Sequence, residues 1–411
     1  MTGKGLRVGA WLLVALMPAC ADDDVVELST SSSNSSTGAT IGTGDNCNTP
    51  GVDTDGDGFA VDQGDCNDCD PNASPASVEV PDSSSDEDCD GEVDEEEPTC
   101  DDALVVDSED PLQAARAIDL CKTSDGSPRW GIVAAKWTQI DGSEPPADGT
   151  TALRFHRGHG LVQNFGNVLV PRRGAAMLAI STGEARDLDD PQSTKAFGFA
   201  NPIVFKWYKC GAPDGFPKQV ASCADQDPPL DTGAEMYDSI GLELTIRAPA
   251  NATGLSFDHN FMQGAWPLSC FEVNPFLALM DPMPAGQFDG NIVFDATGDY
   301  VGQPPTIRVC GCEAGPPCTI YSISSPPVDV ACPLGDAELL GTGFGRDGGD
   351  LGGGTGWQRT QAPVEPNSTF TLRVAVGEND STLGGNHDAT VLLDNWQWRL
   401  EPGIAVQTEP Q

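Results

Sequence analysis

The sequence predicts an all-β protein: a jelly-roll-like β-sandwich with long loops and one short helix, preceded by a disordered tether and an irregular acidic segment. Two observations carry this prediction. From Trp130 onward, short alternating or apolar runs are separated by Gly, Pro, Asn and Asp, and helical periodicity is almost absent. Over residues 47 to about 100, the chain has too few apolar residues to build a core unaided.

The N-terminus has the features of an export signal. Lys4 and Arg7 precede the apolar run AWLLVALM, which is too short to span a bilayer as a stable helix. Residues 1–19 are therefore expected to be a signal peptide. The tetrapeptide MPAC resembles a bacterial lipobox, although its Met and Pro depart from the usual pattern, and it predicts lipidation of Cys20. Cleavage at the overlapping ACA is the alternative, and it would release a soluble protein.

Charge is distributed unevenly along the chain. There are 63 acidic and 21 basic residues, giving a formal net charge of −42, and residues 22–110 carry 28 acidic groups with no lysine or arginine. A chain this acidic is repelled by nucleic acid, which excludes nucleic acid as a partner. Residues 20–46 are rich in Ser, Thr and Gly and predict a flexible tether. Residues 47–100 form an acidic segment that contains cysteines.

Fourteen cysteines in an exported chain predict disulfides. Either processing route takes Cys20 out of the pool and leaves thirteen, so one thiol is expected to be free, intermolecular or bound to something else. A zinc site built on Cys310-x-Cys312 is an alternative use of two of them. The expected bridges join Cys210 to Cys223, and Cys310 or Cys312 to Cys318 or Cys332.

The β domain is expected over residues 103–402, followed by a disordered tail over 403–411. It begins with one helix over residues 111–121, where Asp110 can cap the helix and Pro111 suits its first position. Long loops are expected over 208–232 and 310–360. Strands are expected over 131–137, 175–181, 240–248, 254–261, 275–281, 290–296, 370–378 and 390–400. Along the last of these strands, alternation places Leu392, Asp394, Trp396 and Trp398 on one face.

The stretch DTDGDGFAVDQGD, residues 53–65, has the pattern of a calcium loop. Its aspartates alternate, and Gly58 follows where such a loop must turn sharply. Calcium takes six to eight oxygen ligands, and the twelfth position here is Gly64 rather than a bidentate glutamate, so later aspartates are needed. The candidate ligands are Asp53, Asp55, Asp57, the carbonyl of Phe59, Asp62 and Asp65.

A second copy, DEDCDGEVDEEE, spans residues 86–97 and matches the whole EF-hand loop spacing without flanking helices. Cysteines in and beside both copies suggest that disulfides pin the loops. Magnesium is less suited, because it keeps several of its waters, and a solvated acidic linker is the alternative to a metal site. The candidate ligands are Asp86, Asp88, Asp90, Glu92, Asp94 and Glu97.

Two family resemblances follow from these motifs. The layout DxDGDGF…GDCNDCD…DEDCDGEVDEEE, over about residues 50–97, resembles thrombospondin type 3 loops and the metal-binding repeat of MopE-related bacterial surface proteins. The segments LSFDHNF and DATVLLDNWQW, within residues 103–400, resemble the choice-of-anchor L domain, although MQGAWPLSCFE departs from its pattern. The resemblance implies a surface location, a structural or adhesive role and no catalytic residues.

No enzyme activity is expected, because nucleophile, zincin and phosphate-loop motifs are missing. His156 and His159 would form a metal site only if a turn brought them together, and Asp388 with Asp394 could hold calcium in the sandwich. The chain is therefore expected to be an outer-membrane or cell-surface lipoprotein with bound Ca²⁺, with a surface glycan or protein as its ligand. The alternative is a secreted carbohydrate-binding module or glycan hydrolase.

Overall fold

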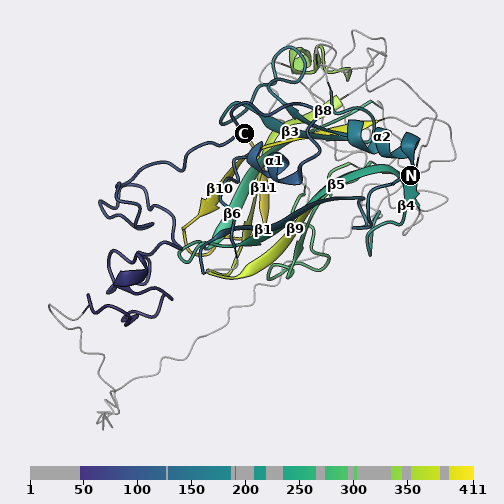
Figure 1. Ribbon diagram of the computed structural model, residues 1–411. Coiled ribbons are helices and arrows are strands. Elements are labelled where there is room, and N and C mark those ends of the chain that lie inside the picture. The colour runs from purple at the N-terminus through teal and green to yellow at the C-terminus, as the bar shows by residue number, and fades with distance from the viewer. Residues whose placement is uncertain are drawn as a thin grey trace, which may run out of the picture. The chain divides into compact units, whose positions relative to one another are not determined.

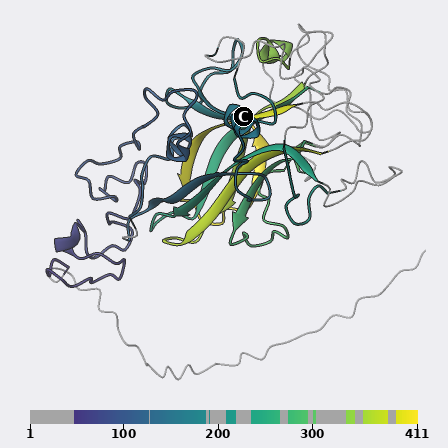
Figure 2. The same cartoon turned by 45° about the vertical axis from the view of Figure 1, so that its right-hand side comes forward.

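The computed structural model describes residues 47–125, 128–186, 190, 208–218, 235–264, 274–294, 300–302, 335–344, 353–379 and 388–411. Within this part of the chain, two antiparallel sheets pack against each other (Figure 1). Figure 2 shows the strands of both sheets from a second side. The predicted all-β sandwich is confirmed.

The first sheet has the order β1-β5-β9-β7, with β4 paired to β5, and the second has the order β11-β8-β6-β10-β3-β2. The strands of the first sheet are β1 (Gly131–Thr138), β4 (Lys209–Cys210), β5 (Met236–Arg247), β7 (Phe276–Asp281) and β9 (Thr369–Asn379). Those of the second are β2 (His159–Val162), β3 (Met177–Ser181), β6 (Gly254–Gln263), β8 (Gly353–Pro363), β10 (Ala389–Arg399) and β11 (Gln407–Pro410).

The central core lies between the sheets and follows the alternation of the strands. Leu242 and Leu244 of β5 meet Phe257 of β6 and Val391 of β10 there, all of them buried. Two smaller apolar clusters of described residues cover the outer faces: Leu392 belongs to the one on the second sheet, and Leu277 and Ala375 belong to the one on the first. Both sheets are therefore buried on two faces over part of their area, which explains their long apolar runs.

A bulge in β10 changes the predicted face of the last strand. The register with β6 shifts beside Asn395, whose φ is 57°. Because a bulge inserts one residue, the alternation reverses after it. Trp396 joins the central core on the side of Val391, whereas Leu392 packs on the outer face. The prediction that Leu392 and Trp396 share a face is wrong.

The described residues include two short α-helices, one before β1 and one between β1 and β2. In α1 (Pro111–Arg116), Asp110 Oδ1 accepts the Leu112 N–H at 2.9 Å, as the sequence predicts. The helix ends before residue 121, because Asp119 takes a left-handed φ of 69° and the chain turns there. The sequence analysis did not predict α2 (Gly149–Arg157), which begins at the N-cap Asp148. No helix in the described ranges has the length and apolar character needed to cross a membrane.

Three further predictions need correction. The tail is not disordered throughout, because β11 pairs with β8 and the Thr360 and Thr408 hydroxyls lie 2.8 Å apart. The predicted loop over 310–360 ends in strand β8, which starts at Gly353. Described residues 290–294 form only isolated bridges rather than a strand, with the buried side chain of Asn291 bonded to backbone groups on either side.

The described cysteines confirm that disulfides pin the acidic loops, whereas the other expected bridges involve residues outside the described part of the chain. Cys210 forms no disulfide with another described cysteine, and its Sγ lies 3.2 Å from Ser239 Oγ; its predicted partner, Cys223, lies outside the described residues. Burial raises the pKa of this thiol to about 11. The predicted pairings, and the alternative zinc site, of Cys310, Cys312, Cys318 and Cys332 lie outside the described residues. Disulfides join Cys47 to Cys69, Cys66 to Cys89 and Cys100 to Cys121, with Cα atoms 5.3, 5.4 and 5.7 Å apart.

Candidate metal centre

The acidic segment, residues 47–100, belongs to the same compact unit as the sandwich. Its own regular structure, among the described residues, is the short 3₁₀ helix η1 (Val61–Gln63). It docks on the sandwich through Val78, whose N–H donates to Asn251 Oδ1 at 3.0 Å and whose carbonyl accepts from Asn251 Nδ2 at 2.7 Å. Trp130 Nε1 also donates to the Ser77 carbonyl at 3.0 Å. Disulfides and docking bonds thus substitute for a core.

The two acidic loops, residues 53–64 and 86–97, have matching backbones. The sixth residue of each is a glycine in the left-handed region, with φ of 102° at Gly58 and 100° at Gly91. In each loop, N–H groups donate to aspartates from the sixth residue to the first, from the fifth to the third, and from the seventh to the fifth. The two copies therefore have the same loop conformation.

In the first loop, two triads of carboxylates have ligand atoms within 4.8 Å of one another. One comprises Asp53, Asp55 and Asp57, and the other Asp55, Asp65 and Asp68. Asp57 is 9% exposed, Asp65 3% and Asp68 0%. The Oδ2 atoms of Asp55, Asp57 and Asp65 are buried and have no hydrogen-bond partner among the described residues. Protein donors therefore leave these three oxygens, which belong to members of the two triads, unsatisfied.

The electrostatics of the first loop point the same way. Burial raises the pKa of Asp55 and Asp57, and it raises that of Asp65 to about 6. Charge repulsion from the neighbouring carboxylates adds to each increase, while hydrogen bonds from backbone N–H groups, and for Asp57 also from the Ser74 side chain, oppose it. A bound cation would relieve both the desolvation and the repulsion. The residues present therefore fit a metal ion.

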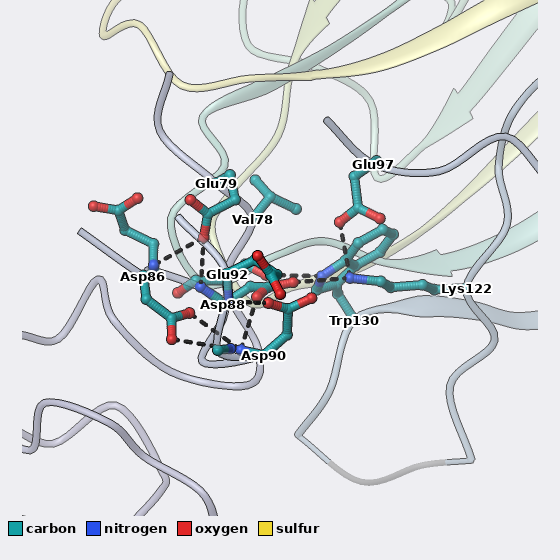
Figure 3. Close-up of polar contacts among 12 residues, drawn as sticks. Val78, Glu79, Asp86, Asp88, Asp90, Glu92, Glu97, Lys122 and Trp130 are labelled. Atoms are coloured by element: carbon teal, nitrogen blue, oxygen red, sulfur yellow. Dashed lines mark hydrogen bonds and ion pairs between the residues drawn. The ribbon is translucent and has the colours of Figure 1, made fainter. Parts of the chain in front are cut away.

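The second loop also has two overlapping triads, shown in part in Figure 3. Asp86, Asp88 and Asp90 form one, and Glu79, Asp88 and Glu95 form the other. Glu95 Oε2 is buried without a hydrogen-bond partner in the described part of the chain, and burial raises the pKa of Glu95. In both loops the aspartate at the third position, Asp55 or Asp88, is shared by the two triads.

Not every predicted ligand joins these triads. Asp62 Oδ1 accepts the Gly51 N–H at 2.7 Å, and Asp94 Oδ1 accepts the Ser83 N–H at 2.9 Å. Glu97 forms an ion pair with Lys122 at 2.8 Å. Backbone capping and the lysine therefore engage the carboxylates of these three. Phe59 and Glu92 stand at the seventh positions, where their N–H groups donate to Asp57 and Asp90.

Three triad residues were missed by the sequence analysis. Asp68 follows Asp65 by three residues within one aspartate-rich run, a signal that could have been used. Glu95 occupies the tenth position of its loop, which carries no ligand in the EF-hand pattern. Glu79 lies outside the loop altogether, so its approach depends on the fold of residues 79–95 rather than on spacing.

The other metal candidates are less complete. The rings of His156 and His159 lie 5.2 Å apart, but His159 stacks on Trp137 at 4.0 Å, and the two have no third ligand among the described residues. Burial lowers the pKa of His159 well below its usual value. Asp394 accepts N–H groups from Arg172, Arg173 and Asn395, and neither it nor Asp388 belongs to a triad of described residues.

Comparisons with protein-family models, with curated proteins and with solved structures find no match to this chain. The two family resemblances therefore stay predictions.

Proposed function

We propose that residues 47–100 are a calcium-binding module in which calcium and disulfides together stabilise the acidic loops. The observation that carries this proposal is the set of three buried, unpaired Oδ2 atoms on Asp55, Asp57 and Asp65. Buried carboxylate oxygens without partners are costly, and a divalent cation removes that cost. Calcium is the best match, because it takes many oxygen ligands in irregular loops, whereas magnesium demands near-octahedral geometry and retains water.

We further propose that the protein is exported, lipid-anchored through Cys20 and displayed at the cell surface. Support comes from the signal-like N-terminus and from the disulfides, which form in oxidising compartments. The β-sandwich would have a structural or adhesive role without catalysis, and calcium would keep the module next to it ordered.

Thermal unfolding of the oxidised full chain tests the calcium proposal. The melting temperature is expected to rise with calcium over chelator, and to rise less with magnesium. Asp62→Asn is the matched control, because Asp62 lies in the same loop but outside both triads. The same calcium shift is expected for this variant. No shift in the wild-type chain would reject the proposal.

Glycan binding by the sandwich is the second candidate function. A groove of about 680 Å³ is lined by Trp130, Trp396 and Trp398 together with Asp119, whose buried carboxylate oxygens have no hydrogen-bond partner among the described residues. Two of the indoles, however, pack edge to face at 5.4 Å, and Trp396 is only 3% exposed, so a flat platform for sugar stacking is missing there. Glycan-array binding that is lost in Trp398→Ala would favour this second function.

A further inference from the structure

The two acidic loops have the same backbone conformation but differ in the positive charge beside them. Among the described residues, no lysine, arginine or histidine forms an ion pair with a first-loop carboxylate of Asp53, Asp55, Asp57 or Asp62. In the second loop, Lys122 Nζ lies 3.3 Å from Asp88 Oδ2 and 2.8 Å from Glu97 Oε1 (Figure 3). The second loop thus already has a cation supplied by the protein.

Several contacts fix Lys122 in this place. The preceding residue, Cys121, is bonded to Cys100 at the end of the acidic segment. The Nζ atom lies 4.7 Å from the centre of the Trp130 ring, within the range of a cation–π interaction. Trp130 is itself held by its bond to the Ser77 carbonyl. Lys122 is therefore positioned from two sides rather than being a loose surface charge.

In the second loop, the triad carboxylate that pairs with Lys122 is that of Asp88. Asp88 belongs to both carboxylate triads of the second loop, and its side chain is 9% exposed. A divalent cation bound by either triad would meet the ammonium group at close range, where like charges repel strongly. It would also compete with Lys122 for the Asp88 carboxylate. The first loop has no such competitor among the described residues.

We propose that Lys122 is a built-in cation that makes the second loop a weaker divalent-metal site than the first. Without metal, the second loop is partly neutralised by Lys122 and has one buried unpaired oxygen, Glu95 Oε2, whereas the first loop has three such oxygens and no protein cation beside them among the described residues. Calcium therefore fills the first loop before the second. This inference rests on the proposed function, and it assigns to one residue the difference between the two sites.

Calorimetric calcium titration of the oxidised, chelator-stripped full chain tests it. The wild-type chain is expected to show a strong and a weak phase, and Asp65→Asn identifies the strong phase by weakening it. Lys122→Gln removes the charge and should tighten the weak phase by about tenfold, as expected for a nearby unit charge. Lys122→Met, a second neutral variant with an unbranched side chain, should do the same. Lys122→Arg keeps the charge and should resemble wild type.

Lys136→Gln is the control for general charge effects, because Lys136 pairs with Glu243 on the sandwich. Two equal phases in the wild type, or neutral variants that bind no tighter than wild type, would overturn this inference and leave the calcium proposal standing. A wild-type chain that takes up no calcium at all would overturn both.

Discussion

Cys66 and Cys89 are joined by a disulfide, with Cα atoms 5.4 Å apart, that ties the first acidic loop to the second. Cys89 stands between Asp88 and Asp90, two triad members, and Cys66 directly follows Asp65, a triad member of the first loop. One covalent bond thus restrains candidate ligands of both loops. The two sites are expected to become ordered together.

Removal of this bond should destabilise the module. The Cys66→Ser/Cys89→Ser double variant releases a closed loop with a sequence separation of 23 residues. Loops of this size correspond to about 3 kcal/mol of unfolding free energy in the chain-entropy description. Denaturant unfolding in chelator should report that loss. Cys210→Ser, at a half-buried cysteine of the sandwich that packs against an apolar cluster, should cost only about 1 kcal/mol. An equal loss of unfolding free energy in both variants would contradict a specific stabilising role of the Cys66–Cys89 bond.

Asp65→Asn should have opposite effects with and without metal. In chelator, the amide removes a buried charge whose pKa is raised to about 6, so the unfolding free energy at neutral pH should increase by about 1–2 kcal/mol. In calcium, the variant should lose much of the stabilisation seen in wild type. Paired melting curves measure both effects. Destabilisation by the amide in chelator would show that Asp65 is not in a metal site.

The pH dependence of the metal-free protein follows from the same group. The unfolded carboxyl titrates near 3.8 and the folded one at about 6, so the unfolded state releases its proton first. The stability contributed by Asp65 is therefore present at low pH and is lost as the pH rises through about 6. The stability difference between wild type and Asp65→Asn should widen between about pH 4 and about pH 7 in chelator.

Calcium binding should have the opposite pH dependence. Because protons compete with the metal for the carboxylates, the calcium affinity of the first loop should fall as the pH drops below about 6. Titrations at several pH values check this expectation. An affinity that is constant down to about pH 5 would mean that Asp65 does not bind the ion.

Asn251→Ala should loosen the docking of the acidic segment without unfolding the sandwich. The variant loses both hydrogen bonds to Val78, at 3.0 and 2.7 Å, which corresponds to about 1–3 kcal/mol. Limited proteolysis should cut within residues 47–100 faster than in wild type, while the main melting transition stays close to its position. Asn72→Ala is the control, since Asn72 Nδ2 donates to the nearby Asp70 at 3.0 Å. If the Asn72→Ala control is cleaved as fast as Asn251→Ala, the hydrogen bonds between Asn251 and Val78 do not dock the segment.

The sandwich was largely predictable because its strands have clear period-two patterns bounded by turn residues. Seven of the eight predicted strand segments coincide with β1, β3, β5, β6, β7, β9 and β10. The failures have local causes. One extra residue at Asn395 reverses the alternation of β10, and β11 is ordered by pairing with β8 rather than by its own sequence. Such tertiary effects leave little trace in a single sequence.

The metal site was predictable where ligands follow a fixed spacing. Asp53, Asp55 and Asp57 come together because alternating aspartates and a left-handed glycine define the loop. Glu79 and Lys122 could not be predicted in the same way. Glu79 approaches the second loop through the fold of the intervening chain. Lys122 lies outside the acidic segment, directly after Cys121 of the Cys100–Cys121 disulfide.

The most direct test of the central claim is calcium calorimetry on the wild-type chain and on Asp55→Asn, at the aspartate shared by both first-loop triads. Saturable binding by the wild type, with the strong phase lost in Asp55→Asn and kept in Asp62→Asn, is the predicted result. Calcium binding that is unchanged in Asp55→Asn, or absent from the wild type, would contradict the assignment of these buried oxygens to a metal ion.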